Sequence, residues 1–123
     1  MGKIYNLEER TAEFGENIID FVRPLKRDEV SRPLISQIVR SATSIGANYM
    51  EADGAESKKD FIHKIALCKK ESKETKHWLR MIAKANPQVN CGNLSKEAHE
   101  LSLIFSSIIL SNNKTSDKNE KKK

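Results

Sequence analysis

The sequence predicts an all-α protein, an antiparallel up-down four-helix bundle formed by a single domain. Three observations support this fold class. The chain has 123 residues, the length of one domain. Apolar residues recur at spacings of three and four along four segments, as they do on helices. Only five glycines and three prolines are present, too few for the turns of an all-β fold.

The first helix is expected at residues 6–25, because its apolar positions have the spacing of a bundle seam. These positions are Leu7, Thr11, Phe14, Ile18, Phe21 or Val22, and Leu25. Pro24 should end or kink the helix near Arg23, since proline removes a backbone donor. The remaining surface of the helix is acidic, at Glu8, Glu9, Glu13, Glu16 and Asp20.

The second helix is expected at residues 31–53, with Ser31 as its N-cap and Pro33 in its first turn. Its apolar face consists of Leu34, Ile38, Ala42, Ile45, Tyr49 and Ala52. The small residues Gly46 and Ala47 would let another backbone approach closely. Gly54 follows Asp53 and is expected to stop the helix.

The third helix is expected at residues 57–86, antiparallel to the second because their connection is short. Ser57 with Asp60 resembles a capping box at its start, and Pro87 bars its continuation. The fourth helix is expected at residues 94–112. Its apolar stripe consists of Leu94, Ala98, Leu101, Ile104, Phe105, Ile108 and Ile109. The bundle would then cover residues 1–111, and the lysine-rich tail at 112–123 is expected to be disordered.

The apolar side of the third helix is wider than one bundle seam requires. One seam consists of Phe61, Cys68, Ser72, Leu79 and Ile82. A second, adjacent seam consists of Leu67, Glu71, Glu74, Trp78 and Ala85. The extra width predicts a subunit interface in addition to a core, and a deeply buried helix in a monomer is the alternative.

The opposite side of the third helix carries a basic stripe, about 20 Å long at 1.5 Å per residue. The stripe consists of Lys69, Lys73, Lys76, Arg80 and Lys84. We hypothesise that it contacts the phosphates of nucleic acid, with RNA favoured over DNA. A merely solvated face is the alternative, because no aromatic residue interleaves with the stripe to stack a base. The tail, which carries a net charge of +3, could assist as an electrostatic arm or be only solvated.

A strip of polar residues on the second helix is expected to meet two carboxylates of the third. The six residues are Arg40, Ser44, Asn48, Glu51, Glu71 and Glu74. Buried polar groups need partners, so we interpret these residues as a structural network that sets helix register. A ligand site is the alternative interpretation. We expect Arg40→Ala to disrupt folding or assembly.

No catalytic site and no cofactor is predicted. Glu74 and His77 have the Glu-x-x-His spacing of di-iron bundles, but that site needs a second such motif. A di-metal carboxylate enzyme is therefore only a remote alternative. Cys68 is expected in the core, and with Cys91 it forms no CxxC pair. Nothing assembles a nucleophile, a base and an oxyanion donor.

The expected location is the cytoplasm, without membrane contact. No apolar run has the length of a membrane span, and the first residues have no apolar signal core. Two partner classes remain open. One is nucleic acid, and the other is an acidic protein docked by the basic face, which would make the chain an adaptor or scaffold.

The segment from Arg40 to Ile82 resembles the four helix bundle protein family, which includes proteins encoded within intervening sequences of bacterial large-subunit ribosomal RNA genes. The matching positions are Arg40, Ser44, Asn48, Glu51, Ser57, Phe61, Glu71, Glu74 and Trp78. The resemblance extends over about residues 10–110. One departure is at the end of the second helix, where members usually have Ala-Glu-Gly and this chain has Gly54 displaced from Glu51.

This resemblance implies a left-turning antiparallel bundle that assembles into a ring, a homopentamer. The biochemical role of the family is poorly defined. A related accessory protein of diversity-generating retroelements binds nucleic acid and a reverse transcriptase. This chain is similar to it in fold type rather than closely in sequence.

Overall fold

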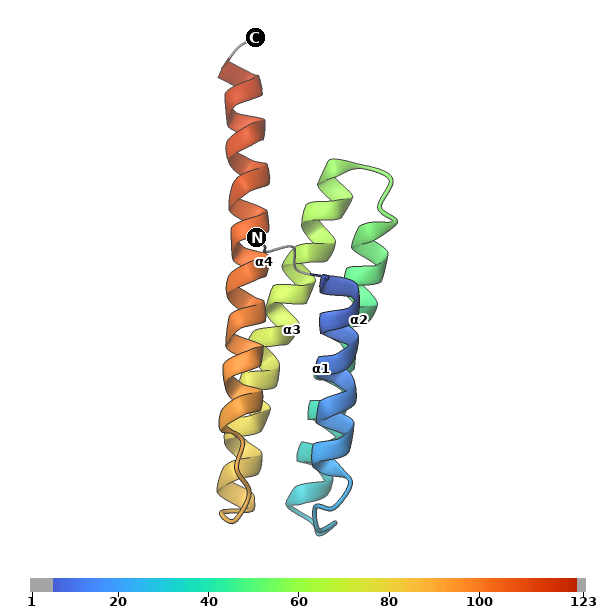
Figure 1. The fold of residues 1–123 in the computed structure, drawn as a ribbon, viewed down its shortest axis with the longest axis vertical. Coiled ribbons are helices and arrows are strands. Elements are labelled where there is room, and N and C mark those ends of the chain that lie inside the picture. Colours follow the sequence, from blue (N-terminus) through green and yellow to red (C-terminus); the bar gives the residue numbers. More distant parts are fainter. Residues whose placement is uncertain (1–5, 122–123) are drawn as a thin grey trace.

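Four helices form the protein in the computed structural model, which describes residues 6–113 with their side chains and the backbone of residues 114–121. The helices are α1 (Leu7–Val22), α2 (Ser31–Asp53), α3 (Lys58–Ala85) and α4 (Gly92–Lys121). The chain reverses direction at each connection, as Figure 1 shows. Within residues 6–121 there is no strand. The predicted all-α bundle of four helices is therefore confirmed.

The helices pack in chain order. The most extensive contact joins α2 to α3, followed by α3 with α4, α1 with α2 and, with the smallest contact, α1 with α4. Because α3 lies between two neighbours, both of its apolar seams are used inside one chain, and Phe61 and Trp78 pack against the core. No large hydrophobic residue of α3 is exposed. The wide apolar side of α3 therefore no longer points to a subunit interface.

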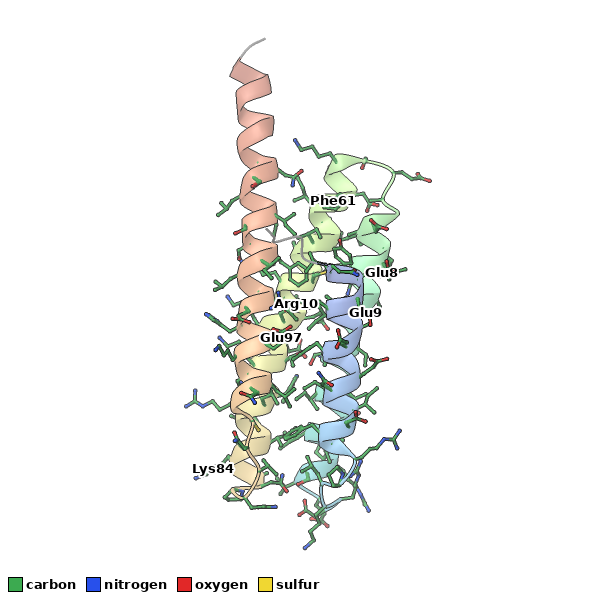
Figure 2. The ribbon with its side chains drawn as sticks, in the orientation of Figure 1. Glu8, Glu9, Arg10, Phe61, Lys84 and Glu97 are labelled. Atoms are coloured by element: carbon green, nitrogen blue, oxygen red, sulfur yellow. The ribbon has the colours of Figure 1, made fainter. Side chains whose placement is uncertain are left out.

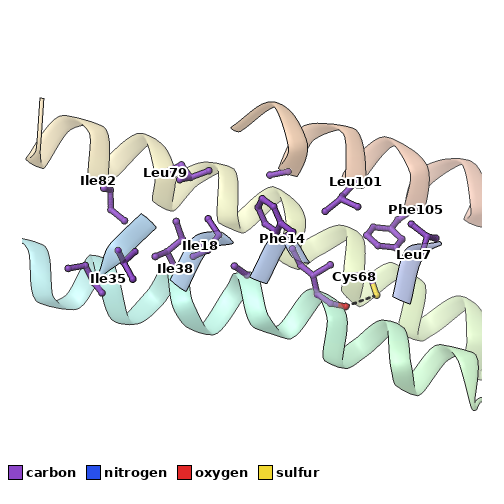
Figure 3. Packing of buried hydrophobic residues seen from close by; sticks show 14 of the residues in the cluster. Leu7, Phe14, Ile18, Ile35, Ile38, Cys68, Leu79, Ile82, Leu101 and Phe105 are labelled. Carbon is purple, nitrogen blue, oxygen red and sulfur yellow. Dashed lines mark hydrogen bonds between the residues drawn. The ribbon is translucent and has the colours of Figure 1, made fainter. Parts of the chain in front are cut away.

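All four helices contribute side chains to one continuous hydrophobic core, shown in Figure 3. Its most deeply buried large residues include Phe14, Ile18, Ile38, Ile45, Ile65, Leu79, Ile82, Leu101 and Phe105. Removing such a side chain from water stabilises a fold by about 1.5–3 kcal/mol. The core therefore follows directly from the apolar spacing of the sequence.

Glycines let α1 and α2 approach closely. A Cβ atom on Gly46 would lie 3.3 Å from Thr11 Oγ1, and one on Gly15 would lie 3.6 Å from Thr43 Cα. The close approach predicted at Gly46 is confirmed. Ala47, in contrast, is exposed.

Proline and serine set several helix ends as predicted. Helix α1 ends at Val22, where the N–H of Arg23 bonds to the carbonyl of Ile19, and Pro24 follows in the turn. Helix α3 begins after Ser57, whose side chain accepts the N–H of Asp60 at 3.0 Å. These ends follow from local chemistry that the sequence displays directly.

The N-terminus of α2 differs from the prediction. Ser31 is the first helical residue rather than the N-cap, and the side chain of Asp28 does the capping. Its Oδ1 atom accepts the N–H of Ser31 at 2.8 Å and that of Val30 at 3.1 Å. The buried Ser31 hydroxyl instead accepts a long hydrogen bond of 3.5 Å from the side-chain amide of Asn86. The hydrogen bond from the Ser31 backbone is the main reason why the pKa of Asp28 lies below its ordinary value of 3.8.

Asp28→Ala is expected to lower Tm at neutral pH, because two N–H groups lose their acceptor. A lowered carboxyl pKa contributes stability that is present above the ordinary value and is lost as pH falls through the folded-state value. The Tm gap between wild type and variant should therefore be full at pH 7 and shrink below pH 3.8. Thermal melts followed by circular dichroism between pH 7 and pH 2 measure it. A gap that stays constant over this range would contradict the capping role of the charge.

Helix α4 is longer than predicted. It begins at Gly92, whose N–H bonds to Asn90 Oδ1 at 2.9 Å, and it continues to Lys121. The predicted end near residue 112 is wrong, and helix replaces the disorder expected for residues 112–121. The reason is that no proline or glycine follows Gly92 to stop the helix. Its last turns project beyond the other three helices in Figure 1, and residues 122–123 of the expected tail lie outside the described residues.

Candidate nucleic-acid interface

The five residues of the basic stripe lie along one side of α3. Lys73, Arg80 and Lys84 are exposed, whereas Lys69 and Lys76 are half-buried. None of the five forms an ion pair with a carboxylate of residues 6–113. Figure 2 shows Lys84 near the end of α3, pointing away from α1. The stripe is therefore a surface of uncompensated positive charge.

Helix α4 extends this surface. The Lys76 ammonium lies 2.9 Å from His99 Nδ1, and Lys96 is exposed one turn earlier on α4. An ammonium group can only donate hydrogen bonds, so His99 Nδ1 is the acceptor in this contact. Sequence reasoning missed His99 and Lys96, because no spacing in the chain indicates which side of α4 faces the stripe.

The first helix has the opposite charge. Five exposed carboxylates make residues 7–22 carry a net charge of −4, and none of these carboxylates pairs with a basic side chain of residues 6–113. They are Glu8, Glu9, Glu13, Glu16 and Asp20. Since α1 and α3 share the neighbours α2 and α4 but do not pack on each other, the two charged surfaces lie on different sides of the bundle. A polyanion would be attracted to α3 and repelled by α1.

Arg10, the one basic residue of α1, is directed toward α4. Its Nε atom bonds to Glu97 Oε2 at 2.7 Å, and its Nη2 atom bonds to Glu97 Oε1 at 2.8 Å and to Glu100 at 3.3 Å. Figure 2 shows Arg10 and Glu97 between the two helices, with Glu8 and Glu9 on the side of α1 away from α4. This bidentate pair connects α1 and α4, whose contact is the least extensive of those between the helices.

Arg40 joins α2 to the two carboxylates of α3, as the sequence predicts. Its Nη1 atom bonds to Glu71 Oε2 at 3.0 Å, and its Nη2 atom bonds to Glu74 Oε2. The Trp78 indole also donates to Glu74, at 2.9 Å. Glu71 is buried, but the Arg40 side chain is 47% exposed, so the expected burial is wrong for Arg40.

The other three residues of the expected network are not part of this cluster. The Ser44 hydroxyl donates to the Arg40 carbonyl, and the Asn48 side chain donates to the Ser44 carbonyl, both within α2. Exposed Glu51 pairs separately with Lys64 at 2.7 Å. This polar strip of α2, from Arg40 to Glu51, is directed outward because the apolar face of α2 packs against the core. A buried polar contact that sequence reasoning missed joins Ser41 to Thr75, at 2.9 Å between hydroxyl oxygens.

The two residues of the Glu-x-x-His motif contact other side chains and do not converge on one point as metal ligands would. Glu74 bonds to Arg40 and Trp78, while exposed His77 lies edge-on to the Trp78 ring, at 5.0 Å between centroids. In the described part of the chain, no three His, Cys, Asp or Glu side chains come together in a metal-binding arrangement. Burial raises the pKa of the Cys68 thiol to about 12, and it also raises the pKa of Cys91. Both thiols are therefore protonated at neutral pH.

No helix in the described residues is both long and apolar enough to cross a membrane, although α4 has 30 residues. Its apolar part ends near Leu110, and the turns that follow are polar.

Comparison with known proteins shows which family and which solved structure the chain is similar to. The family model described as "23S rRNA-intervening sequence protein" matches residues 5–107. A solved structure from Bacteroides thetaiotaomicron VPI-5482, described as a protein with unknown function from the S23 ribosomal protein family, is similar with a TM-score of 0.74. It has 30% sequence identity to this chain, and the match covers 84% of this chain and 97% of the other. Comparison with curated proteins finds no match.

Proposed function

Since this chain belongs to the 23S rRNA-intervening sequence protein family, we propose that it binds RNA through the basic stripe of α3. The observation that supports this proposal is the row of five cations without a carboxylate partner. RNA is placed ahead of DNA because the family description names 23S rRNA. The proposed role is binding without catalysis, in the cytoplasm.

Phosphate contacts would supply the affinity. Cations one helical turn apart cover about 20 Å along α3, enough to follow several phosphates of one strand. Lys96, on the neighbouring α4, would add a further contact beside the stripe. No aromatic side chain lies within the stripe to stack a base, so the binding should tolerate different sequences.

We also propose that the protein forms a homo-oligomeric ring, and the family resemblance favours a pentamer. A ring would present the same basic surface once per subunit. Linked copies of a weak site raise the overall affinity by avidity, provided that one RNA can reach several subunits.

Filter binding of a structured RNA at salt concentrations between 50 and 200 mM tests the proposal. Affinity should fall steeply with salt, and each lost phosphate contact should reduce the slope of log K against log salt by about 0.7–0.9. Lys73→Gln/Arg80→Gln should therefore weaken binding and flatten this slope. The matched control is Lys26→Gln/Arg32→Gln, which removes two exposed charges that are not part of the stripe.

Two outcomes would contradict RNA binding. One is that the wild type fails to bind at 50 mM salt, and the other is that the control loses as much affinity as the stripe variant. If the stripe variant instead loses a co-purifying acidic protein, the chain is an adaptor.

A further inference from the structure

An open groove of about 430 Å³ runs along the seam between α1 and α2. On α1 it is lined by residues between positions 8 and 19, a length of about 16 Å at 1.5 Å per residue. Met50 of α2 adds apolar surface and is one of the few large hydrophobic residues that are exposed. The floor of the groove consists of small residues, which are Ala12, Gly15, Gly46 and Ala47. A long, open groove with small side chains suits an elongated occupant whose backbone can approach closely.

Unpaired carboxylates lie on either side of part of this floor. Glu9 lines the groove near the start of α1, and Glu16 lines it seven residues further along, about 10 Å away on the same face of the helix. Glu8 adds a third carboxylate beside Glu9. All three side chains are exposed, and none of them forms an ion pair within residues 6–113. Between positions 9 and 16 of α1 the groove is therefore negative, then apolar, then negative again.

We propose that this groove binds a helical segment of another protein, with two basic residues seven positions apart and apolar residues between them. Charge complementarity identifies this occupant, because its basic residues would lie about 10 Å apart on one face, the spacing of Glu9 and Glu16. Apolar residues three and four positions after the first basic residue share that face and would contact Ala12, Gly46 and Ala47. Amphipathic helices are recognised in grooves through this spacing of three, four and seven. The pattern is the same in both chain directions, so it fits either orientation of the bound helix.

This partner differs in class from the RNA proposed for α3. Helix α1 carries a net charge of −4 and repels a polyanion, so the groove selects a cationic occupant. Because α1 and α3 do not pack on each other, a helix bound in the groove would leave the basic stripe of α3 open. The flexible Met50 side chain can adapt to different apolar residues, so the spacing of the two basic residues would supply the specificity. The inference concerns a second surface and does not depend on RNA binding.

Fluorescence anisotropy with a labelled synthetic peptide tests the groove. The probe is an alanine-rich helical peptide with lysine at positions i and i+7 and leucine at i+3 and i+4. Glu9→Gln/Glu16→Gln should weaken its binding about tenfold, because two exposed ion pairs are lost. Ala47→Arg covers the floor with a long cationic side chain and should abolish binding. The matched control is Glu13→Gln/Asp20→Asn, which removes two exposed carboxylates of α1 that do not line the groove and should leave the affinity nearly unchanged.

A second peptide separates groove binding from general charge attraction. It has the same composition, but its two leucines lie on the face opposite the lysines, and it should bind more weakly than the first. Equal binding of the two peptides, an equal loss of affinity in the control variant, or no binding by the wild type would each overturn the proposal. Unchanged helix content by circular dichroism verifies that each variant is folded.

Light scattering distinguishes the other occupant of the groove. If the wild type does not bind the peptide and Ala47→Arg lowers the mass in solution, the groove holds a second copy of this chain and the proposal is wrong. The peptide assay contains no RNA, so its failure leaves the proposed function unaffected. Failure of the filter-binding assay likewise leaves the groove proposal unaffected.

Discussion

Phe14→Ala is expected to lower the free energy of unfolding by about 3–5 kcal/mol, the range for removing a buried phenylalanine. Phe14 is 1% exposed and lies among core residues of the other helices, as Figure 3 shows. The surrounding helices can collapse only partly onto the space it leaves, so a cavity adds to the lost burial. A small domain has about 5–15 kcal/mol of stability in total, and the variant should be close to unfolding at 37 °C.

Urea denaturation followed by circular dichroism measures this change. Leu103→Ala is the control, because Leu103 is a large apolar residue that is exposed in one chain. Its substitution should change stability by no more than about 0.5 kcal/mol in the monomer. A loss below about 1 kcal/mol for Phe14→Ala would show that α1 contributes little to the core.

Arg40→Ala is expected to lower the free energy of unfolding by about 2 kcal/mol, typical for losing hydrogen bonds to a charged group. The cost arises mainly at Glu71, which is buried and loses its only ion-pair partner among the described residues. The exposure of Arg40 keeps the figure below the cost of breaking a fully buried pair. Glu74 keeps the Trp78 indole as a donor and should matter less.

A second substitution identifies the cause of this loss. In the Arg40→Ala background, Glu71→Gln removes the buried charge and should restore part of the stability, whereas in the wild type it should destabilise. Lys64→Ala is the control, because it breaks the exposed pair with Glu51 and should cost less than about 1 kcal/mol. If Glu71→Gln gives no recovery, the unpaired carboxylate is not what makes Arg40 necessary.

The helices were predictable because their determinants are local. The spacing of Leu7, Thr11 and Phe14 defines a buried face, and Pro24 and Ser57 set helix ends through their own backbone or side chain. The cap of α2 was not predictable in this way. Asp28 caps that helix from the preceding loop, and the loop conformation is not visible in the residue pattern.

The candidate surfaces were predictable only where one helix carries them. The basic stripe and the pairing of Arg40 with Glu71 follow from spacing on α3 and on a helix expected to be its neighbour. The contact of Lys76 with His99 and the α1–α2 groove depend on how helices are rotated against one another. The width of an apolar face did not indicate whether a neighbour in the same chain or another chain would cover it.

The ion pair of Arg10 with Glu97 has a consequence for the order of folding. The two residues are 87 positions apart, whereas the other helix contacts form across short connections. Closing a long loop costs more chain entropy, and this cost arises before the contact contributes any stabilisation. We therefore expect α1 to meet α4 after the rate-limiting step, so that losing Arg10 speeds unfolding and leaves the folding rate unchanged.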